Sequence, residues 1–190
     1  MKYFNKILLT VILIFSDHSA SFAMKSQENK PFQQPYRHED LAKKREVLKG
    51  FIDALITATN QGNSEIVVGI LASMNFMKPG ALANMRVNDR EYGYNGWTLL
   101  QIAAEQGHEA VVRVLINSGA NPDEKVNAPG SYHHGWTALH IAAWWYKVFN
   151  SQKHGPIMRL LIANNANTEL RIDNPSMEYH NWSTFDILCG

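Results

Sequence analysis

The sequence has few of the residues and motifs that would point to a covalent or catalytic function. Among its 190 residues there is one cysteine, Cys189, so no intramolecular disulfide can form and packing must hold the fold together. The net charge is +1, which gives no electrostatic reason to expect a nucleic acid or an acidic membrane surface as partner. No nucleophile elbow, phosphate-binding loop, paired-carboxylate motif or His-Glu-x-x-His pattern occurs. We therefore expect neither an enzyme nor a nucleic-acid-binding protein.

Residues 1–23 have the pattern of a signal peptide. Lys2 and Lys6 flank a short positive region, and residues 7–15 are apolar except for Thr10. The apolar run is about half of the roughly 20 residues that a spanning helix needs, and small residues at Ser21 and Ala23 suit a signal peptidase. We expect an exported protein, periplasmic or secreted, without membrane contact after cleavage. An uncleaved membrane anchor is the alternative.

The next segment is polar and is followed by two helical patterns. Residues 24–37 contain Pro31 and Pro35 and are predicted to form a disordered leader. From residue 38 to 60 apolar residues recur at spacings of three and four, Gly62 ends the pattern, and residues 64–74 continue as a second helix. Residues 38–79 are therefore predicted to be an N-terminal capping helix pair.

One phrase occurs three times in the second half of the chain. It reads GWTLLQIAA at 96–104, GWTALHIAA at 135–143 and NWSTFDIL at 181–188: a turn, a hydroxyl residue that can cap a helix, and an apolar helix. An aliphatic residue stands ten positions before each tryptophan, at Val87, Val126 and Ile172. The period is thus 39 residues (126 − 87) and then 46 (172 − 126), with the extra residues falling in 144–156. Three copies in register indicate a repeat array.

The phrase GWTALHIAA, together with Gln106-Gly107-His108 and Val111-Val112 after the earlier copy, resembles the ankyrin repeat. The resemblance covers residues 80–190, with an incomplete last copy and fingers about six residues longer than the family norm. It implies an all-α solenoid of stacked helix pairs with extended β-hairpin-like fingers. It also implies non-catalytic binding of a protein partner without a cofactor, and hydrogen bonds of His140 within and between repeats. Exported ankyrin proteins of bacteria are similar.

The fingers carry more aromatic and histidine residues than their turns require. Gly, Asn and Pro supply the turn chemistry, whereas Tyr, Trp and Arg are common interface anchors. An aromatic ladder that stiffens the fingers is a compatible alternative interpretation. The residues predicted to bind a partner are Arg90, Tyr92, Tyr94, Trp97, Tyr132, His133, His134, Trp136, Trp145, Tyr146, Tyr179, His180 and Trp182.

Several alternatives remain open at this stage. The protein could serve a partner in the envelope, act on host proteins as a secreted effector, or bind a metal or ligand through His133, His134, His154 and His180. No histidine spacing matches a metal motif, so no metal site is predicted. The aromatic insertion 144–156 either extends a helix or forms an aromatic lip through Trp145 or Tyr146. The incomplete last repeat predicts self-association or stability that depends on a partner.

Overall fold

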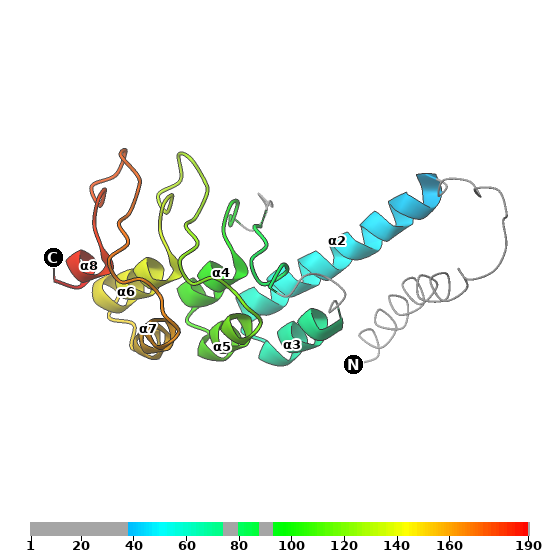
Figure 1. Ribbon diagram of the computed structural model, residues 1–190, viewed down its shortest axis with the longest axis horizontal. Coiled ribbons are helices and arrows are strands. Elements are labelled where there is room, and N and C mark those ends of the chain that lie inside the picture. The colour runs from blue at the N-terminus through cyan, green and yellow to red at the C-terminus, as the bar shows by residue number, and fades with distance from the viewer. Residues whose placement is uncertain (1–37, 74–79, 88–92, 190) are drawn as a thin grey trace, which may run out of the picture. The chain divides into compact units, whose positions relative to one another are not determined.

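The computed structural model describes residues 38–73, 80–87 and 93–189 (Figure 1). The predicted signal peptide and leader, and Arg90 and Tyr92, lie outside these residues. The helices of the described chain are α2 (His38–Gln61), α3 (Ser64–Ser73), α4 (Leu99–Gln106), α5 (Glu109–Asn117), α6 (Ala138–Val148), α7 (His154–Ala163) and α8 (Thr184–Cys189).

Two compact units, residues 1–54 and 55–190, divide the chain within α2. In the first unit the described residues, 38–54, are helical throughout. In the second unit the inner helices α4, α6 and α8 form one row, the outer helices α3, α5 and α7 form another, and the fingers project from the inner row (Figure 1). Extended pairing in the described residues is limited to isolated bridges, Arg86 with Thr98 and Arg171 with Ser183. The predicted all-α ankyrin solenoid is confirmed.

The same pair of backbone hydrogen bonds closes each finger. Val87 N–H donates to the carbonyl of Trp97, and Gly96 N–H donates back to the carbonyl of Val87. The pattern recurs between Val126 and residues 135–136 and between Ile172 and residues 181–182, with N···O distances of 2.7 to 2.9 Å throughout. This closure explains the constant ten-residue spacing in the sequence.

The third residue of each inner helix caps its own helix. At α6, the Thr137 side chain accepts from His140 N–H while His140 Nδ1 accepts from Thr137 N–H, which completes a capping box. Because a backbone N–H can only donate, Nδ1 must be the bare nitrogen, and Nε2–H therefore donates to Leu170 O in the next finger at 2.9 Å. Gln101 takes both roles at α4, since its amide group donates to Glu124 O at 2.6 Å. The predicted hydrogen bonds of His140 within and between repeats are confirmed.

The insertion is accommodated without loss of register. The helix α6 has 11 residues where α4 has 8, and a short loop then leads to His154. His154 Nε2 lies 2.9 Å from Glu105 O, as His108 Nε2 lies 2.9 Å from Asn60 O in the preceding repeat. The interpretation of the insertion as a helix extension is thereby supported, and His154 has the same structural role as His108.

Glycine is required where successive fingers meet. Gly96 and Gly135 have φ of +80° and +81°, and the finger of the next repeat passes directly over each. A Cβ at Gly135 would lie 2.7 Å from Asp173 N, and one at Gly96 would overlap the carbonyl of Asn127. Glycine thus supplies both the left-handed backbone and the close approach that stacking needs.

Replacing Gly96 with alanine should therefore cost more stability than the same change at Gly130. Gly130 has φ of +84° but nothing within 4 Å of its missing Cβ, so Gly130→Ala should lose about 1–2 kcal/mol from backbone strain alone. Gly96→Ala adds the overlap with the next finger and should lose more than about 3 kcal/mol. Urea unfolding measures both losses, and equal values would contradict the close-packing argument.

Burial of His140 should make stability depend on pH. Burial lowers the pKa of His140 to about 4, below the value of about 6.5 expected in the unfolded chain. The folded form therefore binds this proton only at a lower pH than the unfolded form does. As a result, on the order of 1–3 kcal/mol of stability that is present above about pH 6.5 is lost as the pH falls toward 4. His140→Gln, which copies Gln101, should match the parent at pH 7 and lose less on acidification. Urea unfolding from pH 4 to 8 measures the free energy of unfolding of both proteins. The same pH dependence of this free energy in His140→Gln and in the parent would contradict the prediction.

Candidate partner-binding surface

A continuous series of aromatic rings crosses the finger face of the array, which consists of the fingers and the inner helices. We call this series the aromatic ladder. The rings in contact are spaced 4.6 to 6.4 Å apart between centroids, mostly in edge-to-face geometry. The members of the ladder, in chain order, are Tyr94, Trp97, Tyr132, His133, Trp136, Trp144, Tyr179 and Trp182.

Each finger places its ladder residues through the same turn. The residue three positions before the tryptophan is Tyr94, His133 or Tyr179, and its carbonyl accepts the N–H of that tryptophan at 3.0 to 3.1 Å. This turn sets the two rings edge to face at 5.0 to 5.3 Å in every finger. The spacing of an aromatic residue, two others and a tryptophan is therefore a sequence signal for the ladder.

Two of the tryptophans form the buried base of the ladder. The exposed fraction of Trp97 is 3% and that of Trp136 is 0%, whereas the other ladder residues are partly exposed. Within the described chain, Trp136 Nε1 has no hydrogen-bond partner, and its indole is surrounded by the rings of Tyr132, His133 and Trp144. Trp97 and Trp136 thus support the partly exposed rings from below, and the ladder interpretation describes their contacts.

Burial favours the neutral forms of the titratable rings of the ladder. Burial first, and the nearby Glu105 carboxylate second, raise the pKa of Tyr94 to about 12. Burial and a hydrogen bond with Tyr179 raise the pKa of Tyr132 above its usual range, and burial lowers the pKa of His133 to about 4. Burial also raises the pKa of Glu105. Tyr94, Tyr132 and His133 therefore present neutral aromatic surface at pH 7.

The insertion contributes Trp144, which the sequence analysis did not select. Trp144 lies one helical turn after His140 on α6 and contacts Tyr179 at 4.6 Å. Trp145 instead stacks on Phe149 and on His154, at 4.5 and 5.9 Å, away from the ladder rings. Tyr146 is exposed. The alternation arises because successive helical residues point about 100° apart.

The histidines of the metal alternative have separate partners. His133 packs against Trp97, His134 Nδ1 accepts from Ala128 N–H, and His154 bonds to Glu105 O. His180 is exposed. Across residues 38–73, 80–87 and 93–189, no three His, Cys, Asp or Glu side chains come close enough to hold a metal ion. The metal alternative therefore gains no support from the geometry of these histidines.

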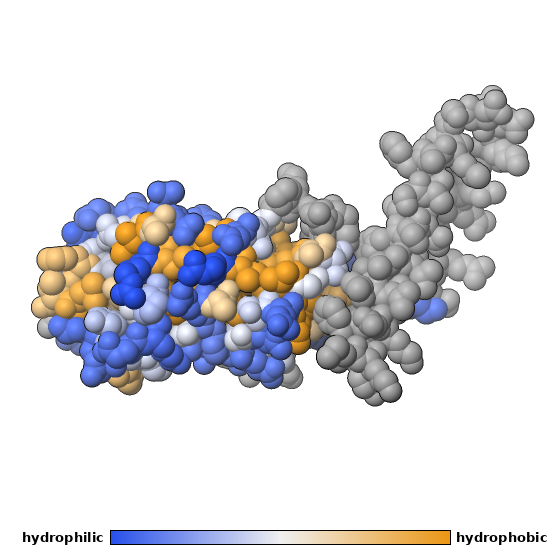
Figure 2. All heavy atoms as spheres, turned by 90° about the horizontal axis from the view of Figure 1, so that it is seen from below, coloured by the Kyte–Doolittle hydropathy of each residue, from blue (hydrophilic) through white to orange (hydrophobic). Residues whose placement is uncertain are grey.

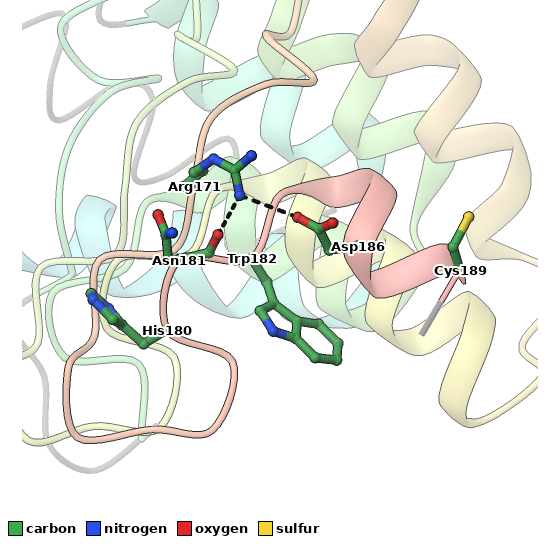
Figure 3. A pocket seen from close by; sticks show the side chains of 6 residues that line it. All are labelled: Arg171, His180, Asn181, Trp182, Asp186 and Cys189. Carbon is green, nitrogen blue, oxygen red and sulfur yellow. Dashed lines mark hydrogen bonds and ion pairs between the residues drawn. The ribbon is translucent and has the colours of Figure 1, made fainter.

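Two other surfaces carry exposed apolar side chains. Figure 2 shows apolar surface between polar margins on the outer-helix side. Exposed apolar residues of the outer helices are Ile66 and Val68 of α3 and Ile162 of α7. At the end of the array, an open depression of about 550 Å³ is lined by residues of the last finger and α8 (Figure 3). We call the second surface the end face. Within the described ranges, no helix combines the length and hydrophobicity that crossing a bilayer demands.

Comparison with known proteins agrees with this architecture. A family model described as ankyrin repeats (3 copies) matches residues 55–172. The search of curated proteins gives no match. Ankyrin repeats are generally protein–protein interaction modules and are typically non-catalytic. With the family match over more than half of the chain, and with stacked helix pairs, fingers and bridging side chains in the family's arrangement, this chain belongs to the ankyrin repeat family.

Proposed function

We propose that this ankyrin-repeat protein is exported and binds a protein partner in the envelope through the aromatic ladder and the finger tips. The observation that carries the proposal is the ladder itself, because partly exposed rings stand on a buried tryptophan base. Tyr and Trp rings held in one position bind partners at low entropic cost, since little side-chain freedom remains to be lost. Backbone hydrogen bonds close the base of each finger and support this fixed placement of the rings.

In this proposal the partner contacts the exposed side chains of the fingers, which we call the finger edges. Tyr132, Tyr179 and His180 offer partly exposed or exposed side chains on the second and third described fingers. Trp97 and Trp136 have a positioning role, because their burial leaves little surface for direct contact. The uncharged state of Tyr132 and His133 fits a partner surface that is apolar or hydrogen-bonding rather than strongly charged.

Removing finger-edge side chains should weaken partner binding while leaving the fold intact. In affinity capture from the native organism with the full chain as bait, Tyr179→Ala with His180→Ala should retain about tenfold less partner than the parent. Val68→Ala with Ile162→Ala on the outer helices is the matched control and should retain it fully. Equal capture by all three baits, each with an unchanged melting temperature, would place the partner elsewhere.

Export rests on the pattern of residues 1–23 and requires its own test. The expected result is a mature chain that begins at Met24 and appears in the fluid released by osmotic shock. Mass spectrometry of cell fractions measures both properties. A mature chain found mainly in the medium or in host cells would favour the secreted effector, and an intact chain in the membrane fraction would favour the uncleaved anchor.

A further inference from the structure

The end face has a basic residue at the position where the other repeats bridge to a neighbour. Arg86, Lys125 and Arg171 are equivalent, at intervals of 39 and 46 residues. Arg86 donates to Lys125 O at 2.8 Å and pairs with Glu124, and Lys125 in turn donates to Arg171 O at 2.8 Å. Arg171 donates to Asn181 O at 2.6 Å, as Arg86 donates to Gly96 O of its own finger at 3.0 Å, and its remaining polar side-chain contact is the Asp186 carboxylate of its own repeat at 3.4 Å (Figure 3). The inter-repeat bridges of the array therefore have no counterpart at Arg171 among the described residues.

The stacking surface of α8 is apolar and exposed. Phe185 stands in the position of Leu100 and Leu139, whose exposed fractions are both 1% within the packed array. The exposed fraction of Phe185 is 68%. An exposed phenyl ring in this position is typical of a surface that binds another apolar surface.

Two substitutions make this face unsuited to a further repeat in the same register. Asn181, with φ of +68°, stands where Gly96 and Gly135 allow the next finger to approach, so its Cβ would meet such a finger. Asp186 stands where Gln101 and His140 donate to the next finger; its carboxylate caps α8 by accepting from Ser183 and cannot donate. The cover for this face must therefore have a different geometry.

The charges of the end face suit a second copy of itself. A two-fold axis brings each residue of a face against a different residue of the same face, so a symmetric contact needs complementary groups on one surface. Arg171 and Asp186 provide one cation and one anion side by side, and their contact within the chain is long, at 3.4 Å, and solvent-exposed. A two-fold axis near this pair would set each guanidinium against the carboxylate of the partner copy. Phe185 precedes Asp186 on α8, so the same axis would bring both copies of this residue to the contact.

We propose that the end face is a homodimer interface, in which Phe185 is covered by the second copy and Arg171 and Asp186 form crossed ion pairs between copies. His180 and Trp182 border both the finger edges and the depression of the end face. Phe185 and Asp186 are not among the ladder residues, so substitutions at these two positions test the dimer apart from the partner proposal. One exposed ring and one ion pair from each copy predict a weak dimer, with a dissociation constant on the order of micromolar.

Sedimentation equilibrium of the full chain, in reducing buffer so that Cys189 cannot cross-link copies, tests the interface. The average mass should rise from monomer toward dimer over about a hundredfold increase in concentration. Phe185→Ser should raise the dissociation constant about tenfold or more, because each dimer loses two buried rings. Asp186→Gln, which keeps the capping geometry of Gln101, should raise it several-fold and remove most of its salt dependence.

Val68→Ser, an equivalent loss of an exposed apolar side chain on α3, is the matched control and should leave the dissociation constant unchanged. A chain that stays monomeric at every concentration overturns the proposal and assigns the end face to an unlike protein. The proposal is also overturned if Phe185→Ser and Asp186→Gln leave the dissociation constant unchanged, or if Val68→Ser raises it as much as they do.

Discussion

The fold depends on one side chain per repeat that serves two backbones at once. Gln101 and His140 accept from the cap of their own helix and donate to a carbonyl of the next finger. Helix initiation and repeat stacking are therefore coupled, and a residue that does only one of these would leave a buried polar group unpaired. The histidines at the outer helices, His108 and His154, add a second row of such bonds toward the preceding repeat.

Stacking held in this way places long fingers close enough for their rings to touch. The aromatic ladder follows from the repeat register, because the same turn recurs in each finger and the glycines at 96 and 135 let the fingers approach. Its base is buried and its edge is accessible, so the same rings stiffen the fingers and offer a surface. The two interpretations of these aromatics that the sequence left open are thus compatible in one structure.

The last repeat departs from the others at the positions that face outward. Asn181 replaces a stacking glycine, Asp186 replaces a donor, and Phe185 enlarges an apolar contact residue. Each departure keeps the local fold intact, since Asp186 still caps α8 and Asn181 still adopts a positive φ. What changes is only the kind of neighbour that the face accepts, which is the physical basis for a contact outside the repeat register.

The sequence by itself determined the repeat family, the helix pairs of the repeats, the register of the fingers and the role of His140, because these depend on local hydrogen bonds and on a fixed spacing. It could not decide which finger residues are accessible: Trp97 and Trp136 match the partly exposed Trp182 in register but are buried. It also missed Trp144, Arg171 and Phe185 as surface-forming residues. Exposure and ring contact depend on what the neighbouring repeat covers, and only the tertiary stacking of repeats decides that.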